Sequence, residues 1–288
     1  MKKWILVLCT CYLLSLCIVG VALTEDPLLR GYEKGEGYVY LQLGHYPQTV
    51  DGDVLPILWR VLDTDSEKAF LLSEYILFAR SLHTSLTEYQ EVLRGDFAGT
   101  ELCHYLNTDF AADAFTDDEM AMLLPCENFG KVFLLSREDM MNKEYGLGIT
   151  NVGTTSLKKI KENPGVRAWG TEWAIMNNGF PQEEYPNPKA RITGRAGANI
   201  SVGEIRLYVY PSKYAKCSPW WGRTQSITSG RQAICTKGDG EVGRIEAGRD
   251  NEGVRPALYL DKNAFKIKSG VGTKEDPYVL VPVEIDSL

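Results

Sequence analysis

The 288-residue sequence has few of the residues from which common catalytic and metal sites are built. It has three histidines, His45, His83 and His104, and none has the HExxH spacing of a zinc protease. A GxSxG nucleophile elbow is absent, and no CxxC pair follows the N-terminal segment. These absences argue against the common hydrolase, zinc-ribbon and thioredoxin-like classes. We therefore expect any histidine to be a hydrogen-bonded structural residue before we expect it to be catalytic.

Basic residues are also fewer than acidic ones. The chain has 31 Lys and Arg against 38 Asp and Glu, a formal net charge of −7. Nucleic-acid binding draws on clustered cationic side chains that displace counterions, so we do not expect nucleic acid as a partner. The content of 44% hydrophobic and 10% aromatic residues predicts a globular chain that buries a substantial core.

The N-terminus carries the pattern of an export signal. Lys2 and Lys3 precede an uncharged, apolar run over residues 4–24. Because this run approaches the roughly 20 residues that cross a bilayer, residues 1–22 are interpreted either as a cleaved signal or as a membrane anchor helix. Residues 23–37 read as a spacer. We predict an exported protein, secreted or anchored at the extracellular face of the bacterial cytoplasmic membrane, which meets the membrane only through its N-terminal segment.

Four cysteines follow that segment, namely Cys103, Cys126, Cys217 and Cys235. An even number in an oxidising compartment permits disulfides, and we expect pairing within each half of the chain, although three connectivities exist. The alternative is that some of them are buried free thiols that pack as small apolar side chains.

The pattern of apolar residues and turn residues predicts one α+β domain over residues 38–288. Strands are expected at residues 39–43, 57–62, 69–72, 131–135, 204–210 and 254–260, with a turn at 44–48. Thr100, Thr116 and Ser136 are expected to cap short helices, the last extending to Tyr145, and a further helix is expected at 171–178. Pro256 lies inside the last strand and predicts a sheet edge or a bulge, since proline cannot donate to a ladder.

Eight motifs occur in a characteristic order. They are GHYPQ (44–48), PILWRVLD (56–63), LLSEYIL (71–77), TELCHYLN (100–107), AFTDDE (114–119), VFLLS (132–136), WWGR (220–223) and GVRPAL (253–258). In this order and spacing the sequence resembles the bacterial domain-of-unknown-function family numbered 6273. It departs from the family pattern at Cys103 and Tyr105, where relatives often carry arginine and tryptophan, and at WWGR, where WLR is more usual.

The resemblance implies a C-type-lectin-like fold in the branch that includes formylglycine-generating enzymes. In that branch a GFR-type closing strand takes the place of GVRPAL. An oxidase of this kind would need reactive cysteines that hold copper, and Cys217 and Cys235 fall in the right half but at a generic spacing. A lectin of this kind would use calcium, bound by several hard oxygen ligands. The loop EEYPNP (183–188) is similar to an acid, proline and asparagine loop, which makes Glu184 and Asn187 candidate ligand contacts and calcium the cofactor to consider.

Aromatic residues supply the other candidates for binding. Trp221 and Arg223 could stack on a sugar or a peptide and hydrogen-bond to it, although Trp221 could equally belong to the core. Four residues are expected to be architectural: Trp59, Arg60, Arg255 and Pro256. The sequence thus predicts an exported, noncatalytic recognition module for a glycan or protein ligand. The alternative is a formylglycine-generating-enzyme-like oxidase that uses thiols and copper.

Overall fold

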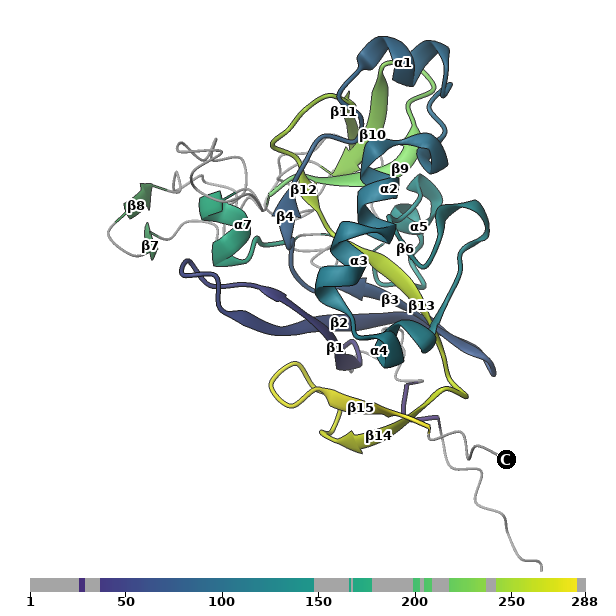
Figure 1. Ribbon diagram of the computed structural model, residues 1–288, viewed down its shortest axis with the longest axis vertical. Coiled ribbons are helices and arrows are strands. Elements are labelled where there is room, and N and C mark those ends of the chain that lie inside the picture. Colours follow the sequence, from purple (N-terminus) through teal and green to yellow (C-terminus); the bar gives the residue numbers. More distant parts are fainter. Residues whose placement is uncertain are drawn as a thin grey trace, which may run out of the picture.

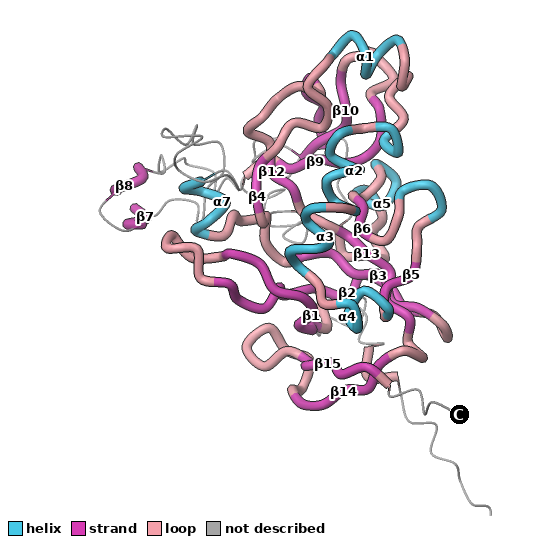
Figure 2. The backbone as a smooth tube through the Cα atoms, in the orientation of Figure 1, coloured by secondary structure: helices cyan, strands magenta, loops and turns pink. Residues whose placement is uncertain are grey.

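The computed structural model describes residues 26–28, 37–147, 166, 168–177, 199–202, 205–208, 218–236 and 242–283. These residues form a mixed α+β structure in which strands predominate and the helices are short (Figure 2). Within the described ranges, no helix has both the length and the apolar character needed to cross a membrane. The predicted signal or anchor at 1–22 lies outside the described residues, as does most of the spacer.

The larger of the sheets has eight strands. Their order is β14 (Phe265–Ser269), β15 (Tyr278–Pro282), β1 (Tyr40–Pro47), β2 (Val54–Thr64), β3 (Lys68–Ser73), β13 (Ala257–Asp261) and β5 (Leu123–Leu124), and β6 (Val132–Phe133) also pairs with β13. All neighbours are antiparallel except β1 and β15. The strand predicted at 131–135 is present only as β6, which is shorter than expected, although residues 132–135 are all buried.

The turn predicted at residues 44–48 is wrong, because β1 continues through Pro47. Gly44 has a φ of +68° and the register with β2 shifts between Gln42 and His45, so the glycine marks a bulge within the strand. The turn comes later, where Gly52 donates its N–H to the carbonyl of Thr49 at 3.1 Å. A bulge and a turn both use glycine at positive φ, which is why the sequence pattern did not separate them.

A second sheet has five strands, in the order β11 (Val242–Glu246), β10 (Gln232–Thr236), β9 (Trp220–Gln225), β12 (Gly253–Val254) and β4 (Phe78–Ala79). It occupies the upper part of Figure 1, above the eight-stranded sheet. The strands β7 (Asn199–Val202) and β8 (Ile205–Tyr208) form a separate antiparallel pair, so the predicted strand at 204–210 is present over its central residues.

The predicted closing strand at 254–260 is in fact two strands that belong to different sheets. β12 pairs in the five-stranded sheet, and β13 lies inside the eight-stranded sheet, with β3 on one side and β5 and β6 on the other. Pro256 is thus neither at an edge nor in a bulge. It lies at the crossing between the sheets, where no backbone N–H is needed for a sheet ladder. Its carbonyl accepts a hydrogen bond from the N–H of Ser73 at 2.9 Å.

Short helices pack against both sheets. They include α1 (Leu86–Glu91), η2 (Phe97–Gly99), α2 (Glu101–Asn107), α3 (Asp109–Ala114), α4 (Asp117–Ala121), η3 (Glu127–Phe129), α5 (Arg137–Met141) and α7 (Glu172–Asn177). Of these, α2 packs on β6, α3 on β1 and α4 on β5 (Figure 1).

The predicted helix caps are present. Thr100 accepts from the N–H of Cys103, and Thr116 forms a capping box with Glu119. The second oxygen of Glu119 accepts from the N–H of Gly44 at 3.0 Å, which ties α4 to the bulge in β1. Ser136 also forms a capping box, but α5 ends at Met141 and does not reach Tyr145.

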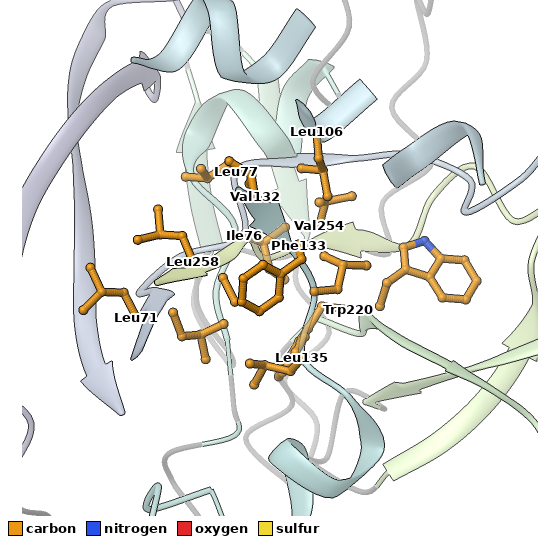
Figure 3. Close-up of a cluster of buried hydrophobic side chains, with 14 of the residues drawn as sticks. Leu71, Ile76, Leu77, Leu106, Val132, Phe133, Leu135, Trp220, Val254 and Leu258 are labelled. Atoms are coloured by element: carbon orange, nitrogen blue, oxygen red, sulfur yellow. The ribbon is translucent and has the colours of Figure 1, made fainter. Parts of the chain in front are cut away.

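A single hydrophobic cluster draws residues from both sheets. Leu71 and Leu258 come from the eight-stranded sheet, Trp220 and Val254 from the five-stranded sheet, and Leu106 from α2 (Figure 3). Each of these side chains is fully buried. The crossing segments at 74–77 and 255–256 join the two sheets over this cluster.

Candidate functional site

The four residues expected to be architectural lie in the core. Trp59 is fully buried and donates its indole N–H to the carbonyl of Leu43 at 2.8 Å. Arg60 is buried and donates its Nε to the carboxylate of Glu74 at 2.7 Å, and its Nη2 contacts the same carboxylate oxygen.

Glu74 stands among several cations. Its second oxygen accepts from Lys274 Nζ at 2.7 Å, and the Lys274 side chain is about one-third exposed. Burial alone would raise the pKa of Glu74, but Arg60, Arg255 and Lys274 outweigh it and hold this pKa below its usual value. The reciprocal effect raises the pKa of Arg60 despite its burial, mainly through Glu74. The carboxylate therefore stays ionised at neutral pH.

Arg255 is fully buried beside this group. Its Nε donates to the carbonyl of Ser73 at 2.6 Å, and its guanidinium carbon lies 5.2 Å from the ring centre of Trp220. Burial, followed by the like charge of Arg60, lowers the pKa of Arg255 to about 9, so it remains a cation at neutral pH. The cation lies against an aromatic ring at the crossing between the sheets. Because this position is fully buried, Arg255 has a structural role.

Two of the four residues expected to contact a ligand, Trp221 and Arg223, do not face solvent freely. Trp221 has 0% of its surface exposed, and its indole N–H donates to the carbonyl of Arg80 at 2.7 Å. A ring with no exposed face offers nothing for a sugar to stack on, so its burial favours the core alternative for Trp221.

Arg223 is likewise engaged inside the protein. Its Nη1 lies 3.1 Å from Asp139 and donates to the carbonyl of Leu134, and its side chain is 17% exposed. Its guanidinium also lies over the rings of Phe129 and Phe133. These contacts fasten α5 and the segment before it to β9, and they leave little of the guanidinium for a ligand.

Three other candidates, Glu184, Asn187 and Cys217, lie outside the described residues. The calcium loop and the copper thiol pair are therefore not placed. In the part of the chain that the structure does describe, no group of three or more His, Cys, Asp or Glu side chains is arranged to hold a metal ion.

The cysteines of the first half are not joined. Cys103 and Cys126 are free thiols, so the disulfide expected between them is absent. Cys103 is buried on α2 with its Sγ 3.6 Å from the carbonyl of Phe129, and burial raises the pKa of this thiol to about 11. Cys235 is 3% exposed on β10. Cys103 and Cys235 are thus both buried in the core.

A cleft of about 490 Å³ opens on one face of the five-stranded sheet. It lies among α5, the hairpin that joins β9 to β10, and β11, and its size falls within the range of ordinary ligand sites. Two arginines line it, Arg137 from α5 and Arg244 from β11, together with Glu138. Neither arginine was a candidate from the sequence.

Local structure explains how these residues meet. The register of β10 and β11 places Ile234 directly opposite Arg244, so both project from the same face of the sheet. The first helical N–H of α5, that of Arg137, donates to Thr224 Oγ1 at 2.9 Å, which docks the helix on β9. At the hairpin tip Ile227 is 101% exposed, an unusual place for a large aliphatic side chain, and it forms part of the cleft wall.

No single segment carries the signal for this cleft. Its lining comes from four stretches, at 137–138, 224–228, 234 and 242–244. The one local clue is an isoleucine in the polar turn sequence SITSG at residues 226–230, and that clue alone does not identify a site.

A second, shallower depression of about 240 Å³ is lined by acidic and aromatic residues, including Asp63, Asp65 and Tyr259. Lys68 already places its Nζ 4.6 Å from the ring centre of Tyr259. Asp65 accepts from the backbone N–H groups of Lys68 and Glu67, which lower its pKa. The charges of this depression are therefore largely used within the protein, and the larger cleft is the better candidate.

Comparison with known proteins identifies a family. A family model described as a domain of unknown function (DUF6273) matches residues 66–262, which is more than half of the chain. Searches of the curated proteins and of the solved structures found no match. The matched range includes β3, the helices, the cleft and the crossing at Arg255 and Pro256. The chain belongs to the family described as domain of unknown function 6273.

Proposed function

We propose that this chain is an exported, noncatalytic recognition module with a C-type-lectin-like fold, and that it binds an extracellular glycan or protein ligand in the cleft beside β11. The observation that carries the proposal is the cleft itself. It combines an exposed aliphatic residue, Ile227, with two arginines among its lining residues. Ligand sites are typically concave, with apolar contact surface and a few polar groups that set orientation.

Two features of the chain support the remaining parts of the proposal. The basic and apolar N-terminal segment supports export. The motif GVRPAL supports the lectin-like fold, since it resembles the GFR-type closing strand of that fold, and here it runs from one sheet to the other through Arg255.

The proposal is tested by screening the full-length protein against glycan and peptide arrays and repeating the screen with two matched variants. Ile227→Ser removes the exposed aliphatic group at the cleft, and Val92→Ser removes another exposed aliphatic group, 69% exposed, outside it. Burying an isoleucine side chain contributes roughly 1.5–3 kcal/mol, so Ile227→Ser is expected to weaken binding about tenfold or more. Val92→Ser is expected to leave binding unchanged.

Two results would overturn the proposal. One is the absence of any ligand on either array. The other is a ligand whose affinity responds equally to the two substitutions, which would place binding elsewhere on the protein.

A further inference from the structure

We infer that the ligand of this cleft is an acidic glycan, whose sugar carboxylate is held by Arg137 and Arg244. The inference rests on the proposed function and names the ligand class of the same site. It begins from the charge of the lining, which contains two arginines and one acid, Glu138. One guanidinium is thus in excess in a chain whose formal net charge is −7.

The two guanidinium groups are available. In the described parts of the chain, the side chains of Arg137 and Arg244 form no ion pair within 4.0 Å. By contrast, Arg60 is paired with Glu74 and Arg223 with Asp139. An arginine presents a planar fork of donors that matches a carboxylate, so unpaired arginines in a cleft favour an anionic partner.

The rest of the lining suits a sugar. Hydroxyl groups come from Thr224 and Thr228, and Thr224 Oγ1 accepts from the N–H of Arg137, which leaves its own O–H free to donate to a ligand oxygen. Ile234 and Val242 supply aliphatic surface between the polar groups. A sugar ring likewise carries hydroxyl groups beside apolar C–H faces, so its polar and apolar parts match those of the lining. A carboxylate on that ring would bind the arginines.

The charge requirement is tested with one pair of ligands. Isothermal titration calorimetry of the full-length protein compares oligogalacturonate with its fully methyl-esterified form, which keeps the ring and hydroxyl groups but lacks the charge. The acid is expected to bind at least tenfold more tightly than the ester, because hydrogen bonds to charged groups are the stronger ones. The affinity for the acid is also expected to fall as the salt concentration rises.

Matched variants locate the effect. Arg137→Gln and Arg244→Gln are each expected to weaken binding of the acid about tenfold and to leave binding of the ester unchanged. Arg249→Gln changes an exposed arginine that does not line the cleft, and it is expected to have no effect. Circular dichroism and thermal unfolding of each variant check that the fold is retained.

The outcomes separate this inference from the proposed function. Equal binding of acid and ester, lost in Ile227→Ser, would overturn the acidic ligand and leave the cleft as the binding site. An oligoglutamate that binds as tightly as the oligogalacturonate, with the same dependence on Arg137 and Arg244, would overturn the glycan in favour of an acidic peptide. No binding of oligogalacturonate, with an array ligand still lost in Ile227→Ser, would overturn this inference alone.

Discussion

Replacing Glu74 by glutamine tests the account of the buried charges at the join between the two sheets. The Glu74 side chain is 6% exposed and bonds to Arg60, which is 5% exposed, and to Lys274. Removing one partner of a buried pair leaves the other charge uncompensated, at a cost of about 3–5 kcal/mol. Glutamine keeps the volume of the side chain and one hydrogen-bond acceptor. Because Lys274 is about one-third exposed, its contact is screened by solvent, and we expect a loss of about 3 kcal/mol in the free energy of unfolding.

Urea unfolding followed by tryptophan fluorescence measures this loss. Glu67→Gln is the control, because Glu67 is an exposed carboxylate at the turn between β2 and β3. The double variant Arg60→Met with Glu74→Gln is expected to be more stable than Glu74→Gln alone, because it removes the guanidinium that has lost its carboxylate. A change below about 1 kcal/mol for Glu74→Gln would refute the reasoning.

The same pair predicts a pH dependence. Because the pKa of Glu74 is lowered in the folded protein, its contribution to stability is present above the unfolded value of about 4.5 and is lost as the pH falls through the folded value. The difference in stability between the wild type and Glu74→Gln should therefore be constant at neutral pH and shrink below pH 4.5. A difference that instead grew on acidification would contradict the lowered pKa.

Three further substitutions and one labelling experiment test the fold. Asn107→Ala removes a side chain that makes five hydrogen bonds to backbone groups, among them 2.9 Å bonds to the carbonyls of Phe129 and Val132. It should lower the free energy of unfolding by about 2–4 kcal/mol. The control Asn128→Ala changes an exposed asparagine and should leave the free energy of unfolding unchanged. Gly44→Ala would place a Cβ 2.6 Å from Phe115 at positive φ, and it should lower the free energy of unfolding measured with a denaturant by about 2–4 kcal/mol. Gly37 also has a positive φ but open space around it, so Gly37→Ala should cost only the strain of the left-handed backbone, about 1–2 kcal/mol. Thr116→Ala should lower the free energy of unfolding by about 1 kcal/mol through the loss of a helix cap, and the thermal midpoint should fall accordingly. An unchanged midpoint would argue against the capping box. Alkylation in denaturant without reductant, followed by peptide mapping, should modify both Cys103 and Cys126, and a disulfide-linked peptide would show that they are paired after all.

The features that sequence reasoning predicted correctly depend on neighbouring residues. The capping boxes at Thr116 and Ser136 involve groups three residues apart, so their hydrogen bonds follow from local order alone. Strands β2 and β3 were visible because their apolar residues form continuous runs bounded by turn residues. The same local reasoning overextended α5 and mistook the bulge at Gly44 for a turn, since both alternatives use the same residue types.

The sequence by itself determined the α+β class, the caps, most strand positions and the family, all of which follow from short-range patterns or from ordered motifs. Only the tertiary structure decided what those motifs do. Trp221 packs in the core, where its indole N–H is satisfied by the carbonyl of Arg80, 141 residues away. The strand predicted around Pro256 is divided because its two halves pair with different sheets. The cleft between Arg137 and Arg244 likewise exists only where separate segments converge. Burial and proximity depend on partners distant in the chain, and local sequence patterns do not report such partners.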